Sequence, residues 1–317
     1  MRRVSFGFSL CITRKEKKMK ILKKSKGLDQ WVQALPYILP SLILISLFVI
    51  YPLLKNIKIS FFNYDILQNK TLDFIGFKNY KTLFNSNEFF ISLRNSIIYT
   101  FFTVLGQLFF GLLLANLINN ARKNQTFFKV VTYLPVVTSW VVISLLFRNI
   151  FSAGKSGLVN YFLLSIHLIP NPISWLQNVG TANFVLCLFG IWKGVGWTML
   201  IYFAALQGIS KTLYEAAVID GASSVQRFYK ITLPLVKNTT LYLLTVLTIG
   251  SFGAYIHVMM ITKGGPMGQT RELMNMVYDT AFISWNFSYA SAQAVIMGLI
   301  IFLLSFVQRK ITREMEN

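Results

Sequence analysis

The chain has 317 residues, of which 54% are hydrophobic and 13% are charged, and its mean hydropathy is +0.54. An average soluble domain carries about 25% charged residues, so this composition excludes a disordered chain and an ordinary soluble enzyme. The formal charge of +20 does not indicate nucleic-acid binding, because Lys and Arg stand between long apolar runs rather than on a polar folded surface. Two distant cysteines, Cys11 and Cys187, offer neither a disulfide framework nor a metal cluster.

The amino-terminal segment is rich in Lys and Arg and contains one short apolar stretch, Phe6–Ile12. This stretch is too short for a signal peptide, and no small-residue cleavage site follows it. We therefore expect residues 1–30 to form a basic cytoplasmic tail. Translation that starts at Met19 agrees with the sequence as well as translation that starts at Met1.

Six uncharged windows follow, each long enough for a helix that crosses a bilayer, which takes about 20 apolar residues. Their apolar residues surround the whole helix rather than one stripe, which is typical of spanning helices. We predict an all-α membrane protein in which residues 31–317 form one transmembrane domain. The six spans are predicted near Leu35–Leu54, Ile97–Ile118, Val130–Ile150, Ala182–Leu206, Leu241–Ile261 and Ala290–Val307.

The loops between these spans differ in their content of Lys and Arg, which predicts the orientation of the chain. The amino-terminal tail, the second and fourth loops and the carboxyl-terminal end carry most of the basic residues. Both termini are therefore predicted to be cytoplasmic. The first external loop also contains basic residues, but it is long and carries Asp65, Asp73 and Glu88.

The fourth loop, residues 207–237, has the pattern of structured helices rather than of a solvated connection. Thr212 and Glu215 have the spacing of a capping box at the start of a helix. Gly221 stands where a left-handed residue ends a helix. Ser223 or Ser224 is expected to cap a second short helix, which Pro234 would end.

A helix–Gly–helix unit on the cytoplasmic side is expected to be a docking surface. The small side chains of Ala216 and Ala217 would let a partner approach closely, and Glu215 and Asp220 would supply charge for pairing.

The spacing Glu215-Ala216-Ala217, three residues, Gly221, nine residues, Ile231, one residue, Leu233-Pro234 resembles the EAA loop of binding-protein-dependent ABC importer permeases. The string YEAAVIDGASSVQRFYKITLPL is similar to the carbohydrate-uptake subgroup, with its maltose and glycerol-3-phosphate permeases. Four further segments agree: Trp192-Lys193 with Gly196, Ala205–Ile209, Ile261–Pro266 and Tyr289–Ala292. The chain departs from the pattern at Ser210, where Pro is common, and at Gly253-Ala254-Tyr255, in a helix that lines the path in this family.

The resemblance implies six helices of the type I ABC importer kind and a transport subunit in a bacterial plasma membrane. It implies a second homologous permease, a dimer of cytoplasmic ATPase that binds ATP and Mg, and an extracellular sugar-binding protein. This chain itself would hold no cofactor and would not be an enzyme. In the 207–237 loop, Ala216 and Ala217 would fit a cleft on the ATPase, Glu215 would pair there, and Gly221 would permit the turn. The resemblance leaves open whether the substrate is a mono-, di- or oligosaccharide or a polyol phosphate.

Four residues are candidates for the substrate path. Ser251 and Tyr255 lie one helical turn apart, so they would share a face that contacts either a sugar or a neighbouring helix. His257 lies in the same predicted span, and it is not expected to bind a metal. Lys193 is either a functional charge within the membrane or a side chain that extends to the outer interface.

Two glycine patterns are candidate sites. Gly190, Gly194 and Gly196 form a small-residue face that favours close helix packing over a substrate gate. Gly154-Lys155-Ser156 resembles the end of a phosphate-binding loop, but Asn149 stands where that loop needs Gly, so nucleotide binding by this chain is rejected.

Two other classes of protein compete with this interpretation. An ion-coupled secondary transporter usually needs carboxylates within the membrane, and none of the six predicted spans contains Asp or Glu. A membrane enzyme would need a nucleophile with a base, or a metal cluster, near a span. Only the importer interpretation explains the 207–237 loop.

Overall fold

The computed structural model describes residues 34–64, 73–121 and 123–316, so the basic tail expected at residues 1–30 lies outside the described residues. The chain separates into two compact units, Met1–Lys58 and Ile59–Asn317. The described part of the first unit belongs to one apolar helix, which begins at Ala34 and passes through a π-helical turn, η1 (Ser46–Ile50), into α2 (Tyr51–Ser60). The predicted span Leu35–Leu54 lies within this helix.

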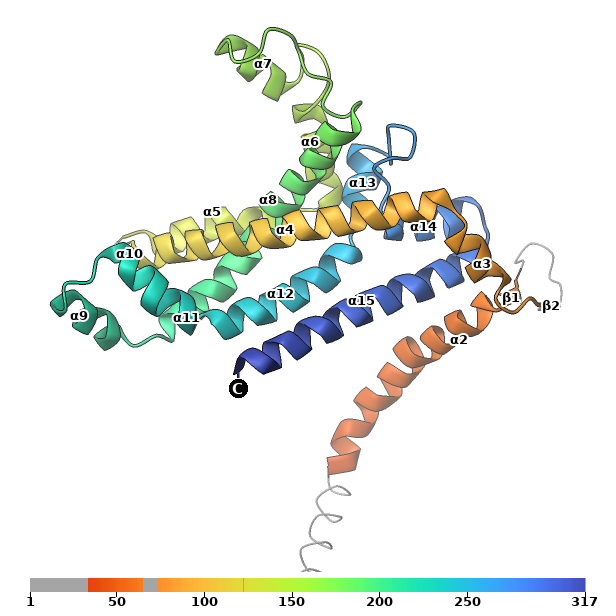
Figure 1. The fold of residues 1–317 in the computed structure, drawn as a ribbon, viewed down its shortest axis with the longest axis horizontal. Helices are drawn as coiled ribbons and strands as arrows, with labels where there is room; N and C mark the ends of the chain where they lie inside the picture. The colour runs from red at the N-terminus through yellow and green to blue at the C-terminus, as the bar shows by residue number, and fades with distance from the viewer. Residues whose placement is uncertain (1–33, 65–72, 122, 317) are drawn as a thin grey trace, which may run out of the picture. The chain divides into compact units, whose positions relative to one another are not determined.

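Two long helices, α4 (Asn87–Asn120) and α8 (Val179–Gln207), pack along each other at the centre of the second unit (Figure 1). Glycines of α8 allow this approach, since a Cβ at Gly190 would lie 2.5 Å from the Tyr99 hydroxyl. A Cβ at Gly194 would lie 2.4 Å from the Gln107 side chain. Gly190 and Gly194 therefore allow close packing of α8 on α4.

Helix α5 (Gln125–Val137) packs on a different side of α8, where a Cβ at Gly196 would lie 2.3 Å from the Thr132 carbonyl oxygen. The prediction that Gly196 shares one face with Gly190 and Gly194 is therefore wrong, because these two glycines face α4. Helix α12 (Lys237–Phe252) contacts α4 and α8. The main apolar core sits where α4, α8 and α12 meet, around the fully buried side chains of Ala115, Met199 and Leu243.

Two predicted spans are broken. The span predicted near Val130–Ile150 consists of α5 and α6 (Trp140–Ile150), which are bent by 94°. The span predicted near Leu241–Ile261 consists of α12 and α13 (Ile256–Ile261). The prediction of two continuous helices is wrong, because hydropathy counts apolar residues and does not register a break in the backbone.

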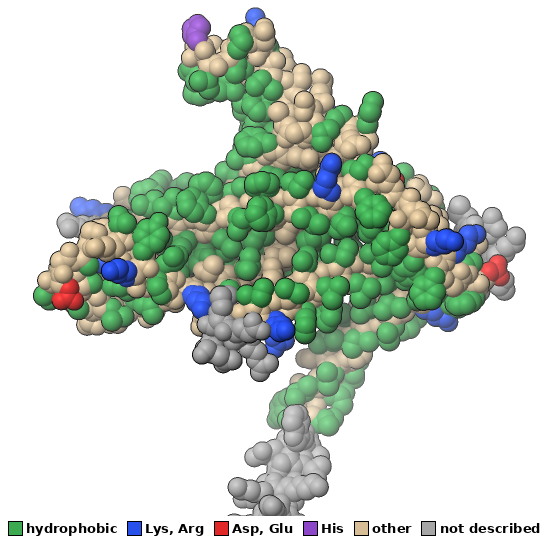
Figure 2. Space-filling model, viewed as in Figure 1, with side chains coloured by type: hydrophobic (Ala, Val, Ile, Leu, Met, Phe, Trp, Pro, Cys, Tyr) green, Lys and Arg blue, Asp and Glu red, His purple; other side chains and the backbone are tan. Residues whose placement is uncertain are grey.

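The other predicted spans lie in longer helices: Ile97–Ile118 in α4, Ala182–Leu206 in α8 and Ala290–Val307 in α15 (Phe287–Glu316). Among the described residues, four helices are long and apolar enough to cross a membrane. Up to six spans result if two bent pairs each count as one span, namely Gln125–Val137 with Trp140–Ile150 and Ser224–Leu235 with Lys237–Phe252. On the face seen in Figure 2, hydrophobic side chains are spread along the middle of α4 and α15.

A projecting loop connects α6 to α8 and contains α7 (Leu158–Ser165), which lies away from α4 and α15 (Figure 1). The side chain of Asn160 is fully buried and fastens this loop. Its Nδ2 donates to the carbonyls of Ser152, Gly154 and Ile173 at 3.3, 3.1 and 2.9 Å. Its Oδ1 accepts from the Ile173 amide and the Trp175 indole.

The remaining elements stand before α4 and before α15. The strands β1 (Phe62–Asn63) and β2 (Asp73–Phe74) pair antiparallel, with Phe62 opposite Phe74, and α3 (Lys78–Phe84) follows. Between α13 and α15 lie α14 (Leu273–Tyr278) and a π-helical turn, η3 (Asp279–Ile283). This last segment is fixed to α4, since the Asn95 side chain donates to the carbonyls of Gln269 and Arg271.

Candidate functional site: a helical loop and a pocket between broken spans

The 207–237 loop folds into short helices. Helix α9 (Lys211–Ile219) ends at Gly221, whose φ of +76° lies in the left-handed region. The Gly221 amide donates to the Val218 carbonyl at 3.0 Å, and the Ala222 amide donates to the Ala217 carbonyl at 2.8 Å. These two bonds form a Schellman motif, so the predicted role of Gly221 in ending the helix is confirmed.

The start of α9 differs from the prediction. The helix begins at Lys211 after Ser210, and its N-cap makes no side-chain hydrogen bond. The Thr212 hydroxyl instead lies 2.7 Å from the Ser210 hydroxyl. The capping box predicted for Thr212 and Glu215 is therefore wrong, because the extended backbone of Ser210 starts the helix earlier.

The second short helix, α10 (Ser224–Arg227), begins with the capping box of Ser223 and Gln226, so capping by Ser223 is confirmed. It continues through a π-helical turn, η2 (Phe228–Thr232), into α11 (Leu233–Leu235). Pro234 does not end the helix as expected, because it occupies the first turn of α11, where its missing N–H is tolerated. The chain bends by 63° after Leu235 instead.

Helix α9 exposes most of its side chains. Glu215, Ala216 and Asp220 are exposed, and Ala217 is half-buried. The large apolar side chains exposed on this helix are Leu213, Val218 and Ile219. A hydrogen bond of 2.9 Å between the hydroxyls of Tyr214 and Thr232 ties α9 to η2.

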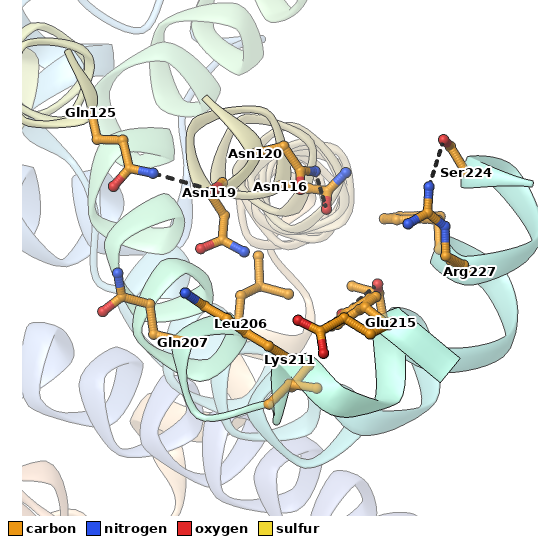
Figure 3. Close-up of a pocket in the computed structure, with 14 residues that line it drawn as sticks. Asn116, Asn119, Asn120, Gln125, Leu206, Gln207, Lys211, Glu215, Ser224 and Arg227 are labelled. Carbon is orange, nitrogen blue, oxygen red and sulfur yellow. Dashed lines mark hydrogen bonds between the residues drawn. The ribbon is translucent and has the colours of Figure 1, made fainter. Parts of the chain in front are cut away.

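A polar pocket of about 820 Å³, here called the loop pocket, lies between α9, α10 and the ends of α4, α5 and α8 (Figure 3). Its lining includes Asn116, Asn119, Gln207, Lys211, Glu215 and Arg227. Glu215 and Lys211 reach it from α9 and Arg227 from α10, where the Arg227 guanidinium donates to the Ser224 hydroxyl at 3.1 Å (Figure 3). Glu215 thus lines the loop pocket beside the bundle and also stands on an exposed helix.

Lys193 lies in α8, and only 2% of its surface is exposed. Its ammonium donates to three carbonyls of the α5–α6 bend, those of Pro135, Val136 and Thr138, the last two at 2.9 Å. The last carbonyls of a helix lack partners within that helix, so Lys193 caps α5 at the bend. The Lys193 side chain does not extend away from the protein, because all three of its protons are bound inside it.

A second pocket of about 460 Å³, here called the span pocket, lies where the two broken spans face each other. The α5–α6 bend contributes Val136 and Trp140, and the break between α12 and α13 contributes Gly253, Ala254 and Tyr255. The rest of the lining includes Tyr99 and Gln107 of α4, Lys193 and Trp197 of α8, and Gly250 and Ser251 of α12.

Ser251 and Tyr255 do not share a helical face, because α12 ends at Phe252 and Tyr255 stands in the break. The prediction of one face is wrong, yet both residues line the span pocket together with Lys193. The Ser251 hydroxyl lies 3.5 Å from the Thr103 hydroxyl, so it also contacts a neighbouring helix. Both alternatives of the sequence interpretation are compatible with this position.

His257, the fourth candidate, does not line the span pocket. It is fully buried, its ring stacks on that of Tyr99 at 4.4 Å between centres, and its Nε2 lies 3.2 Å from a carboxylate oxygen of Glu272. Burial raises the pKa of the Glu272 carboxyl, and the imidazole beside it opposes that rise. His257 therefore supports the wall of the pocket from behind Tyr99.

Sequence reasoning missed Glu272, Trp140 and Trp197. Glu272 is a lone acidic residue in a polar stretch, and a partner 15 residues away leaves no local signal. The two tryptophans stand in apolar runs, where ordinary packing is the default interpretation. Among the residues that the structure describes, no cluster of three or more His, Cys, Asp or Glu residues could hold a metal ion.

Several apolar helical spans, two of them broken at one aromatic pocket, and a helical loop with an exposed face together define a multi-span membrane transport protein. Residues 107–317 match the family described as "Binding-protein-dependent transport system inner membrane component". The chain belongs to this family, and it is a permease subunit of an ABC importer. The resemblance that the 207–237 loop carries is thereby confirmed.

Relatives and solved structures agree with this assignment. The chain is 34% identical to the probable ABC transporter permease protein YurN of Bacillus subtilis (strain 168), over 86% of this chain and 94% of the relative. It is 33% identical to the lactose transport system permease protein LacF of Rhizobium radiobacter, over 92% of this chain and 97% of the relative.

The fold is similar to that of a bacterial ABC transporter involved in the import of the acidic polysaccharide alginate. The TM-score is 0.79 at 22% identity, over 93% of this chain and all of the matched chain. A second structure of an alginate transporter, in complex with a pentasaccharide-bound periplasmic protein, matches with a TM-score of 0.78 at 22% identity, over 92% of this chain and 97% of that chain.

Proposed function

We propose that this chain imports a sugar across a bacterial plasma membrane as one of two permease subunits. The observation that carries the proposal is the span pocket, where the aromatic side chains of Tyr99, Trp140, Trp197 and Tyr255 stand beside Gln107 and Ser251. Sugars are bound by apolar aromatic surfaces together with a few polar groups that match their hydroxyls. The lactose permease among the relatives supports the same substrate class.

The partners follow from the family. A second homologous permease would complete the path, and a dimer of cytoplasmic ATPase would bind ATP and Mg, so this chain needs no cofactor of its own. An extracellular sugar-binding protein would deliver the sugar, which the family description and the periplasmic protein in the alginate complex support. Apolar side chains along the bundle would face the lipid bilayer.

We assign the coupling to the ATPase to Glu215, Ala216, Ala217, Asp220 and Gly221. The exposed face of α9 and the left-handed turn at Gly221 support this assignment. The partner would pack on Ala216 and Ala217, and the carboxylates would pair with basic groups of the ATPase. Both termini and the 207–237 loop would then lie in the cytoplasm, which agrees with the Lys and Arg distribution.

Affinity purification of the full-length chain from its native membrane in a mild detergent tests the proposal. Mass spectrometry should identify an ATPase and a second six-span permease in the purified complex. The binding protein that belongs to the complex is then screened for sugars by calorimetry, and uptake of the sugar that binds is measured in proteoliposomes that contain ATP. A complex that forms but transports no sugar would contradict the substrate class. A chain that transports while purified alone would contradict the importer.

A further inference from the structure

The span pocket contains one charged side chain among its described lining residues, that of Lys193. A free ammonium in such a pocket would attract a carboxylate or a phosphate strongly, because the surroundings have a low dielectric constant. The state of this cation therefore decides whether the pocket favours an anionic or an uncharged ligand.

The protons of Lys193 are already donated. An ammonium has three N–H donors, and here they bind the carbonyls of Pro135, Val136 and Thr138. An anion in the pocket would have to displace one of these carbonyls, which would then be left buried without a donor. The cost of losing that hydrogen bond opposes the binding of an anion.

The charge of Lys193 is also opposed by the helix that it caps. The carboxyl-terminal end of a helix carries about half a negative charge, and Pro135 and Val136 belong to the last turn of α5. The Trp140 ring, 5.2 Å from the ammonium, places its negative face toward the same cation.

An acidic side chain, that of Glu272, stands behind one wall of the pocket. Glu272 lies behind Tyr99, where it is paired with His257. Glu272 therefore brings no positive charge to this side of the pocket.

We propose that the span pocket takes uncharged sugars and rejects sugar acids and polyol phosphates, with Lys193 as a positioning residue that holds the α5–α6 bend. The proposal rests on the sugar import proposed above and narrows its substrate class. In this view the buried cation completes a wall of the pocket, and its field is balanced there by backbone carbonyls.

The charge preference of the pocket is measurable without knowing the sugar. Gly250 lines the pocket, and a Cβ added there meets nothing within 4 Å. The variant Gly250→Cys is made in full-length chain that also carries Cys11→Ser and Cys187→Ala, and is purified with its partners. Its rates of modification by sulfonatoethyl and trimethylammonioethyl methanethiosulfonate, one anionic and one cationic, are each divided by the rate with free mercaptoethanol.

A balanced pocket gives normalised rates that agree within about tenfold, whereas an uncompensated ammonium a few ångströms away would separate them by about a hundredfold or more. A preference for either reagent beyond tenfold would overturn the proposal. The added substitution Lys193→Gln should then favour the cationic reagent, because the carbonyl dipoles remain without the cation. An unchanged ratio of the two rates in the Lys193→Gln variant would show that the charge of Lys193 does not offset the carbonyl dipoles.

Lys193→Arg serves as the matched control, since it keeps the charge and the donors and should give the ratio of the Gly250→Cys parent. It also keeps the test decisive if Lys193→Gln fails to fold. The reagent rates depend on this pocket alone, so their outcome is independent of whether the purified complex transports a sugar.

Discussion

The turn at Gly221 allows a quantitative test of the coupling proposal. A residue with a Cβ pays about 1–2 kcal/mol in the left-handed region, and at Gly221, with φ +76°, an added Cβ meets nothing within 4 Å. The cost of Gly221→Val is therefore a backbone cost without a steric clash. Because α9 must end in its Schellman motif to present Ala216 and Ala217, we expect the affinity for the ATPase to fall by about 5- to 30-fold.

The assay is binding of the purified ATPase to the permease complex in nanodiscs, with membrane yield measured in parallel. The yield should not change, because Gly221 lies outside the predicted spans and is exposed. Gly221→Asn is the matched control, since Asn adopts the left-handed conformation more readily than other residues with a Cβ. Equal affinity of the Val variant and the original chain would refute the reasoning, as would an Asn variant that binds as weakly as the Val variant.

Three further substitutions test the elements that hold the pocket and its surroundings. Lys193→Met should lower the free energy of unfolding by about 3 kcal/mol or more, because three carbonyls lose their donor and each unsatisfied buried group costs about 1–3 kcal/mol; denaturant titration checks this against Lys193→Arg. Glu272→Ala should lower the thermal midpoint clearly more than Glu272→Gln, which keeps a hydrogen bond to His257; equal shifts would contradict the pairing. Asn160→Asp should make residues 152–178 sensitive to limited proteolysis, because the new carboxylate faces three carbonyls; the exposed Asn149→Asp should leave the cleavage pattern unchanged.

Features that depend on a few neighbouring residues were predictable from the sequence. The end of α9 at Gly221 and the start of α10 at Ser223 each depend on hydrogen bonds over three to five positions. The family resemblance is equally local, since its defining residues lie within the 207–237 loop. These parts were confirmed by the structure or by the comparisons.

Features that depend on distant partners were not predictable. The acceptors of Lys193 lie 55 to 58 residues away in the sequence, so its role as a cap leaves no local pattern. The two broken spans had weak signals in Pro135 and Gly253, but apolar length alone favoured continuous helices. Ser251 and Tyr255 were correctly placed in one region, although by an argument from helical spacing that the break invalidates.

The break between α12 and α13 separates a helix that can tilt, α12, from a segment that is fixed in the protein, α13. Helix α12 has 16 residues and is therefore about 24 Å long. The next helix, α13, is held by the pair of His257 and Glu272, whereas the opposite end of α12 continues directly from the 207–237 loop. If α12 tilts by about 5° about the break, its end at the 207–237 loop moves by about 2 Å. A small change of angle beside the pocket therefore corresponds to a displacement of the loop by about one atomic diameter.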